Sequence, residues 1–260
     1  MFGLARLGRM PLDWLAGWWR IIFFGAQLQV LALSPSSYAQ GGGSRLLRHM
    51  YLDTAPILWW FTALSALLTL VITRIVIVTA LSYGLSQYAL EMVIRVLVLE
   101  LIPLTAALFV ALRCTIPNGA ALAEMRRSGE FAELARSGID PVVTHVLPRS
   151  TAGIFACVML AALSCVVALV LAYLAVYGLT SAGFEGYARV FGRIFTPAVA
   201  AIFVVKTLFF SLAVSVIPMA SGLYDVEGDG SRESAALQGL VRMFAVLLLL
   251  EAVSLTGNYA

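Results

Sequence analysis

The chain has 260 residues, of which 61% are apolar and only 12% are charged. A typical soluble domain carries about 25% charged residues, so this chain could not hide its apolar surface in water and lipid must be part of its solvent. The formal net charge is only +3, and Lys206 is the single lysine. No dense basic stripe of the kind that nucleic-acid-binding proteins carry is visible, and we expect no nucleic-acid partner.

Residues 1–50 are expected to form an N-terminal interfacial helix and a linker, and residues 51–260 the membrane domain. Pro11–Leu33 combines an apolar stretch with tryptophans and arginines, which favours a helix lying at the membrane surface. A sixth spanning helix is the alternative for this segment. Residues 34–44 (SPSSYAQGGGS) have the composition of a loop.

The rest of the chain predicts an all-α membrane protein. Continuous apolar runs of about 20 residues are long enough to cross the hydrocarbon core as helices. We expect five transmembrane helices, at Thr54–Leu81, Ala89–Leu112, Thr151–Val176, Phe195–Met219 and Ala235–Leu255.

The distribution of arginines predicts the orientation of these spans. Arginines are frequent before span one and between spans two and three, are absent between spans one and two, and number two between spans three and four. The positive-inside rule then places the N-terminus in the cytoplasm and, after five crossings, the C-terminus in the periplasm. We therefore expect a multi-pass protein of the bacterial inner (cytoplasmic) membrane.

The polar segment between spans two and three predicts one or two short amphipathic helices. Asn118 is a suitable N-cap and Gly138 a suitable C-cap, while Gly129 should break or bend the run. A cytoplasmic helix tied to spans at both ends can transmit force from a soluble partner. A helix that merely lies on the membrane surface is the alternative.

Ionisable side chains within the spans are costly unless they are paired or hydrated, so each is a candidate for function. Five of them are singled out as candidates: Arg74, Arg95, Glu100, Lys206 and Glu251. Glu100 and Lys206 lie on different spans and could pair with each other or face a wet cavity. A structural ion pair that fixes helix packing is the alternative to a role in binding. Arg74 and Arg95 are expected to extend toward the outer interface.

Catalytic and metal-binding motifs are missing from the sequence. The six residues before Lys206 contain no glycine, so no phosphate-binding GxxxxGK[ST] loop exists and another chain must hydrolyse ATP. His49 and His145 lack metal-ligand spacing, and the three cysteines form no CxxC pair. We expect a non-catalytic subunit with no cofactor and no metal.

Several short stretches are similar to one known family of membrane proteins. In chain order they are LELIP (99–103), Arg113, Met125 with Arg126, GIDP (138–141), Pro148 with Arg149, Lys206 with Thr207, Tyr224 with Asp225, and Glu251. Their order and spacing resemble the MlaE/YrbE permease family, the membrane subunits of Mce-type ABC transporters that move lipids. The resemblance covers about residues 54–256.

The chain departs from the family pattern at several places. Leu99 stands where the family has arginine, Ile102 and Gly129 replace a glycine and an acidic residue, and the glycine-rich stretch before the last span is reduced to residues 227–230. The chain is therefore a divergent member by resemblance, which leaves open a heteromeric pair of permeases.

The resemblance implies a function, a set of partners and two groups of residues. The expected function is movement of lipids, phospholipids first, between the inner membrane and the periplasmic or outer-membrane side. The implied partners are a cytoplasmic ABC ATPase, a periplasmic Mce-domain protein, a second permease copy or paralogue that completes a dimer, and membrane lipids. The implied lipid pocket contains Leu99, Glu100, Lys206 and Glu251. The implied ATPase contact contains Glu124, Met125, Arg126, Glu130, Leu134 and Asp140.

Two other functions stay open. The chain could be a transport-incompetent paralogue that acts as a scaffold or heteromeric partner, which the altered segment between spans two and three motivates. It could also be a stand-alone secondary transporter, which would need a membrane-embedded ion site and no ATPase.

Overall fold

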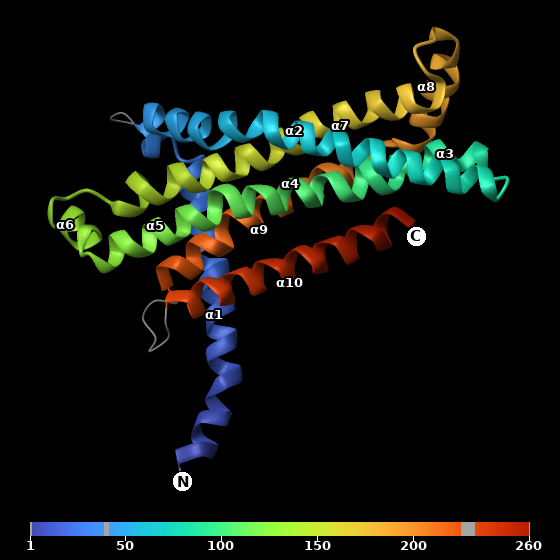
Figure 1. Cartoon of the computed structure of the whole chain (residues 1–260). Coiled ribbons are helices and arrows are strands. Elements are labelled where there is room, and N and C mark those ends of the chain that lie inside the picture. Colours follow the sequence, from blue (N-terminus) through green and yellow to red (C-terminus); the bar gives the residue numbers. More distant parts are fainter. Residues whose placement is uncertain (1, 39–41, 225–231, 260) are drawn as a thin grey trace.

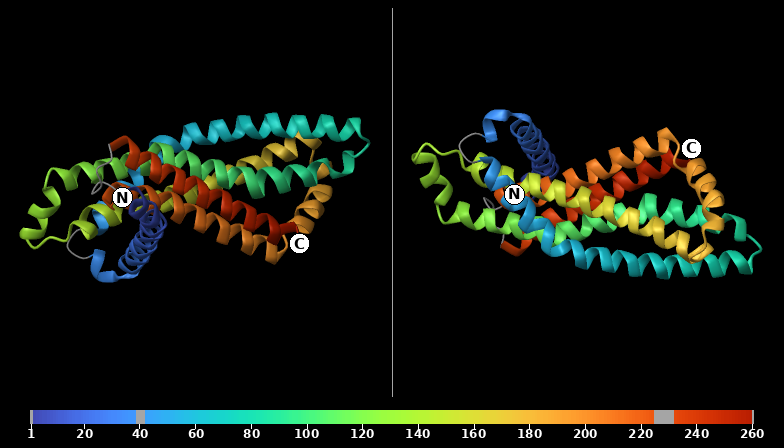
Figure 2. Two further views of the ribbon diagram at one scale, coloured as in Figure 1. Left: turned by 90° about the horizontal axis from the view of Figure 1, so that it is seen from below. Right: turned by 90° about the horizontal axis from the view of Figure 1, so that it is seen from above.

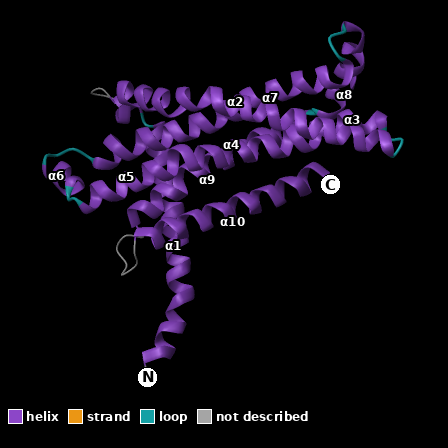
Figure 3. Ribbon diagram, viewed as in Figure 1, coloured by secondary structure: helices purple, strands orange, loops and turns teal. Residues whose placement is uncertain are grey.

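The computed structural model describes residues 2–38, 42–224 and 232–259, and all regular structure in these ranges is helical (Figure 3). The elements are α1 (Phe2–Leu33), η1 (Pro35–Tyr38), α2 (Gly42–Ser82), α3 (Ser86–Val93), η2 (Ile94–Leu101), α4 (Ile102–Val110), η3 (Ala111–Thr115), α5 (Ile116–Arg127), α6 (Glu130–Arg136), η4 (Val142–Val146), α7 (Leu147–Tyr177), η5 (Ser181–Gly183), α8 (Phe184–Ile194), α9 (Pro197–Tyr224) and α10 (Arg232–Tyr259). The predicted all-α class is confirmed.

Within the described ranges, five helices are long and apolar enough to cross a membrane, as the sequence predicts. They cover residues 42–82, 88–127, 142–177, 197–224 and 237–257. In Figure 1 these helices run along one common direction, with α6 at one end of the bundle and α8 at the other. Figure 2 shows α9 and α10 side by side, and the C-terminus lies at the α8 end.

Among the described helices, α2 and α7 share the most extensive contact along their length. The face of α2 that is buried against the bundle repeats every three or four residues and carries small hydroxyl side chains, Ser65, Thr69 and Thr73 among them. The buried face of α7 is similarly small, with alanines at positions 152, 156, 161, 168 and 172. Small side chains allow the backbones of membrane helices to approach closely, and Phe61 of α2 and Leu160 of α7 add bulky buried side chains to the core.

The second span is longer than the sequence predicts. The helix continues from Tyr88 to Arg127 instead of ending near Leu112. Asn118 is therefore not an N-cap, which corrects the sequence prediction. The helix continues past Pro103 and Pro117 because the segments before them, η2 and η3, change locally to π-helical hydrogen bonding. The Asn118 amide instead donates a hydrogen bond to Asp53 on α2, with 3.2 Å between Nδ2 and Oδ2.

The polar segment forms the two short helices expected from its pattern. Gly129 separates α5 from α6 with a φ of 82°, and Gly138 follows α6 with a φ of 75°. Positive φ values are available to glycine at little steric cost. The N–H groups of Gly138 and Ile139 donate back to carbonyls of α6, which ends the helix as a C-terminal glycine motif does.

Helix α1 runs across the other helices in Figure 1 and is not among the five candidate spans. Its Ile21, Phe24 and Leu28 are buried in the same core cluster as residues of α9. The ring of Phe24 meets Tyr224, at the end of α9, edge to face with centroids 5.6 Å apart. Helix α1 is thus held against the α6 end of the bundle by an apolar stripe.

Candidate functional site: a charged cluster between three spans

Three ionisable side chains from three different spans meet inside the bundle. Lys206 of α9 forms ion pairs with Glu100 of η2 and with Glu251 of α10, where Nζ and Oε2 lie 2.8 Å apart. Exposed fractions of the side chains are 2% for Lys206, 8% for Glu100 and 15% for Glu251. The structure therefore brings together three of the five charged residues that the sequence singles out, and Glu251 is the most accessible of these three.

Local helix geometry explains why this position can hold a cation. The segment η2 is π-helical, so the N–H of Ile102 donates to the carbonyl of Leu97, five residues earlier. The next residue, Pro103, has no N–H and can donate to neither Val98 nor Leu99. Single π-helical turns inside α-helices are frequent at functional sites. The result is a stretch of span two with carbonyls that need donors from outside the helix.

Two neighbouring helices supply those donors. The thiol of Cys165 on α7 donates to the carbonyl of Val98, with 3.6 Å between Sγ and O. The ammonium of Lys206 donates to the carbonyl of Leu99 at 3.3 Å. Leu99 thus takes part in the cluster through its backbone, which a sequence comparison based on side chains could not show. The ring of Phe210, whose centroid is 5.5 Å from Nζ, covers another side of the ammonium.

A second carbonyl that a proline leaves without its helical donor is found where α5 packs on α9. Pro218 lies inside α9 and cannot donate to the carbonyl of Val214 four residues earlier. The hydroxyl of Thr115 donates to that carbonyl at 2.6 Å. Span two and α9 are therefore joined by polar contacts at two levels, at Lys206 and at Thr115.

Glycines bring α5 and α9 into backbone contact. A Cβ atom added to Gly119 would lie 2.7 Å from the carbonyl oxygen of Pro218, and one added to Gly222 would lie 2.5 Å from the carbonyl oxygen of Gly119. Real Cβ atoms do not approach backbone atoms so closely, so this contact requires glycine at both positions.

The residues predicted to contact an ATPase divide into two groups. Glu124, Glu130 and Asp140 are exposed, whereas Met125, Arg126 and Leu134 are half-buried. Met125 accepts a contact from the guanidinium of Arg149, with 3.5 Å between Nη1 and Sδ. Helices α5 and α6 and the turn after them thus expose acidic side chains and direct apolar side chains toward the bundle.

Arg126 is engaged within the chain. Its guanidinium donates to the carbonyl of Leu223 and lies over the ring of Tyr224, 5.9 Å from the centroid. Cations near the last carbonyls of a helix are favourable. Arg126 therefore links α5 to the C-terminal end of α9, a role that the sequence does not indicate.

An apolar groove and an ion pair lie near the opposite end of the bundle. Arg95 pairs with Glu91, with 3.0 Å between Nε and Oε1. The spacing of four residues on a helix could have predicted this pair. Both residues line an otherwise apolar groove of about 610 Å³ between α2 and α3, together with Ile75, Val76, Thr79, Ala80, Tyr83, Leu85, Tyr88, Ala89 and Met92. Arg74 is exposed on α2.

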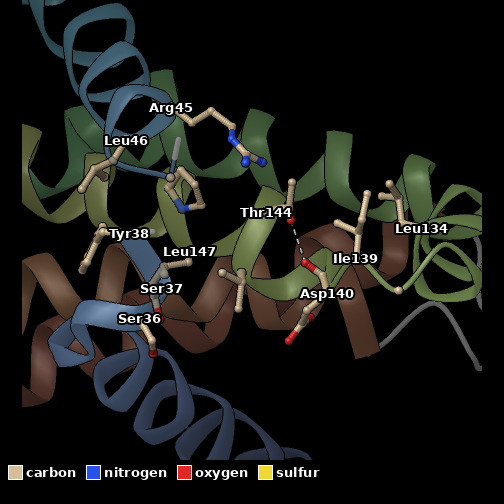
Figure 4. Close-up of a pocket in the computed structure, with 14 residues that line it drawn as sticks. Ser36, Ser37, Tyr38, Arg45, Leu46, Leu134, Ile139, Asp140, Thr144 and Leu147 are labelled. Atoms are coloured by element: carbon tan, nitrogen blue, oxygen red, sulfur yellow. Dashed lines mark hydrogen bonds between the residues drawn. The ribbon is translucent and has the colours of Figure 1, made fainter. Parts of the chain in front are cut away.

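A second cavity, of about 510 Å³, lies at the α6 end and is shown in Figure 4. Residues of η1, the start of α2, and the segment from α6 to α7 line it, including Tyr38, Arg45 and Asp140. Its only hydrogen bond drawn in Figure 4 runs from the hydroxyl of Thr144 to the carbonyl of Asp140, at 2.8 Å. This cavity shares no residue with the charged cluster.

Within residues 2–38, 42–224 and 232–259, no group of three or more His, Cys, Asp or Glu side chains is placed to hold a metal ion. The family positions at Asp225 and residues 227–230 lie outside the described residues.

Comparison with known proteins agrees with these features. No curated protein sequence matches the chain. The model of one protein family, described as "Permease MlaE", matches residues 46–256. This match covers all five candidate spans except the first residues of α2 and the last of α10, and it includes every residue of the charged cluster and of the α5–α6 segment. The chain belongs to the MlaE permease family.

Proposed function

We propose that this chain is the permease subunit of an ABC transporter that moves phospholipids between the inner membrane and the periplasmic or outer-membrane side. A separate ATPase chain hydrolyses the ATP. The observation that carries the proposal is the buried cluster of Glu100, Lys206 and Glu251, placed at a π-helical turn in a chain of the MlaE permease family. Intramembrane charges of this kind mark substrate pathways.

The apolar groove near Arg95 supports a lipid as the substrate. Its volume of about 610 Å³ lies within the range of about 300–1,000 Å³ typical of ligand sites. Its apolar lining suits acyl chains. The exposed aliphatic face of α2 adjoins it, with Leu67 and Val71 on the same helix. A lipid could therefore enter from the bilayer without crossing a polar surface.

The α5–α6 segment is the proposed docking site for the ATPase. It projects at one end of the bundle in Figure 1 and exposes Glu124, Glu130 and Asp140. We further propose a dimer of permease chains, a periplasmic Mce-domain partner, and an orientation with α6 in the cytoplasm and the C-terminus in the periplasm.

Two continuous routes lead from this segment to the charged cluster. One follows the second span from α5 back to Glu100. The other passes through the glycine contact and Arg126 into α9, which carries Lys206 about 25 Å from Leu223 at 1.5 Å per residue. A displacement of α5 and α6 by the ATPase therefore changes the positions of both partners in the ion pair, which is how closure of the ATPases would reshape the lipid site.

Mass spectrometry of the gently solubilised native complex tests this proposal. An ATPase, an Mce-domain protein and bound phospholipid should be released together with this chain. A chain that is released alone and free of lipid contradicts the proposal and favours a secondary transporter. Recovery with a second permease that alone contacts the ATPase favours the scaffold function.

A further inference from the structure

We propose that the charged cluster recognises the ammonium group of a lipid headgroup, so that amine-bearing phospholipids are the preferred substrates. This inference rests on the proposed function as a lipid permease and adds the headgroup chemistry. It follows from the contacts of Lys206, the balance of acidic and basic groups, and one buried hydroxyl beside Glu251.

Lys206 is already engaged within the chain. Its ammonium donates hydrogen bonds to the carboxylate of Glu100 and to the carbonyl of Leu99, and it forms an ion pair with Glu251. The Oε2 atom of Glu251 accepts no hydrogen bond within the described residues. Binding an anionic headgroup through Lys206 would therefore require breaking a buried ion pair, which is costly. The lysine is better suited to hold the two carboxylates in place.

The cluster contains more acidic than basic groups. Two carboxyl groups, those of Glu100 and Glu251, face a single ammonium. On span two the nearest further charges in sequence, Glu91 and Arg95, pair with each other and add none. On α10, Arg242 lies toward the other end of the helix, where it packs against Gly17 of α1. A buried negative charge is stabilised by a cation that donates hydrogen bonds.

Glu251 is the carboxylate that a ligand can reach. Its side chain is 15% exposed, about twice as much as that of Glu100. On the same face of α10, Leu248 and Leu255 are 62% and 39% exposed, so an apolar surface open to acyl chains adjoins it. Between α9 and α10, the carboxylate thus lies next to lipid-facing helix surface instead of being sealed in the core.

A buried hydroxyl offers the second acceptor. Ser254 follows Glu251 by three residues, which places the two side chains on one face of α10 about 4.5 Å apart along the axis. Ser254 is only 8% exposed, and its hydroxyl has no hydrogen-bond partner within the described residues. Buried hydroxyls normally have a partner. A primary ammonium next to Glu251 could donate to both the carboxylate and this hydroxyl. A choline-type headgroup has no donor, and a glycerol headgroup donates only from uncharged hydroxyls, which form weaker hydrogen bonds with a carboxylate.

The test compares an amine-bearing lipid with two lipids that lack the ammonium group. The full chain, copurified with its partners, is exchanged into detergent with equal amounts of a phosphatidylethanolamine, the same lipid N-acetylated, and a phosphatidylglycerol of the same acyl chains. Lipids retained after washing are counted by mass spectrometry. We expect the amine-bearing lipid to be retained about tenfold over its N-acetylated form, equivalent to about 1.4 kcal/mol.

Two variants locate the recognition. Glu251→Gln keeps the shape of the side chain but removes its charge, and should reduce the preference to about twofold or less. Glu185→Gln removes an exposed carboxylate on α8 and should keep the preference. Ser254→Ala should reduce it partly.

The outcomes separate the two proposals. Equal retention of all three lipids by the unmodified protein overturns the ammonium inference and leaves lipid binding intact. An undiminished preference in Glu251→Gln also overturns the inference, because the selectivity would then arise elsewhere. Retention of no phospholipid of any kind overturns the proposed function itself.

Discussion

Substitution of Lys206 by methionine should be among the most destabilising single changes in this protein. Methionine is similar in length and keeps contact with Phe210, but it leaves Glu100 and Glu251 buried without their shared cation. Removing one partner of a buried ion pair costs about 3–5 kcal/mol. At about 2–4 °C per kcal/mol for a chain of this size, the melting temperature should fall by about 6–20 °C.

Replacing the whole cluster should recover most of that loss. In the triple variant Glu100→Gln, Lys206→Met, Glu251→Gln no charge is left without a partner, and such replacements of complete buried pairs are often neutral or stabilising. Intrinsic tryptophan fluorescence during heating of the detergent-solubilised protein measures both variants. A Lys206→Met protein that melts within about 2 °C of the unmodified chain would refute the reasoning.

Transport measured on the same variants distinguishes a structural cluster from a functional one. If the triple variant regains stability and still moves lipid between vesicles and acceptor membranes in the assembled complex, the cluster only fixes helix packing. We expect stability to return and transport to remain lost, because the carboxylates that would meet the headgroup are then neutral amides.

Four further predictions concern other parts of the fold. Gly119→Ala should destabilise the chain by about 1–3 kcal/mol in thermal unfolding, because the added Cβ would collide with the backbone of α9. Gly192→Ala is the control: no atom lies near the added Cβ, so the change should be neutral or stabilising by up to about 1 kcal/mol. Arg126→Gln should lose about 1.5–3 kcal/mol with the charge-assisted hydrogen bond to the end of α9; an unchanged melting temperature contradicts this link. Glu130→Lys, on the exposed face of α6, should leave the melting temperature unchanged and weaken ATPase association about tenfold in a pull-down titration. The hydroxyl of Tyr187 on α8 donates to the carbonyl of Leu169 on α7 at 2.9 Å, so Tyr187→Phe should cost about 1 kcal/mol in thermal unfolding. Because burial raises the pKa of Tyr187 to about 12, its hydroxyl stays protonated and this cost should be constant across neutral pH.

Much of the architecture could be predicted from apolar runs alone. The five spans, the break at Gly129 and the end of α6 at Gly138 follow from residue types that act locally. The meeting of Glu100 with Lys206 could also be anticipated, because two opposite charges in apolar spans have few other ways to lower their energy. Glu251 is also an ionisable residue within a span, but its place beside Glu100 and Lys206 is implied only by the family resemblance.

Features that depend on tertiary packing could not be predicted. The sequence predicts Asn118 as the N-cap of a separate helix after span two, and π-helical pairing in η3 allows one helix to continue instead. No periodicity indicates that Arg126 turns toward Leu223, since a basic residue near a helix end is equally compatible with solvent or a partner. The backbone contact at Gly119 could not be predicted for the same reason, because a glycine inside a helix does not indicate which residue it packs against.

The π-helical turn η3 also affects which changes in length this helix can accept. A π turn closes over five residues where an α turn closes over four, so Ala111–Thr115 accommodates one more residue within a single turn. Loss of one residue from this turn would convert it to an ordinary α turn while the flanking segments keep their facing. Loss of one residue from α4 or α5 would instead rotate one part of the helix against the other by about 100°. Insertions and deletions among related permeases should therefore concentrate in η3, and an alignment that opens a gap there preserves the contacts on both sides.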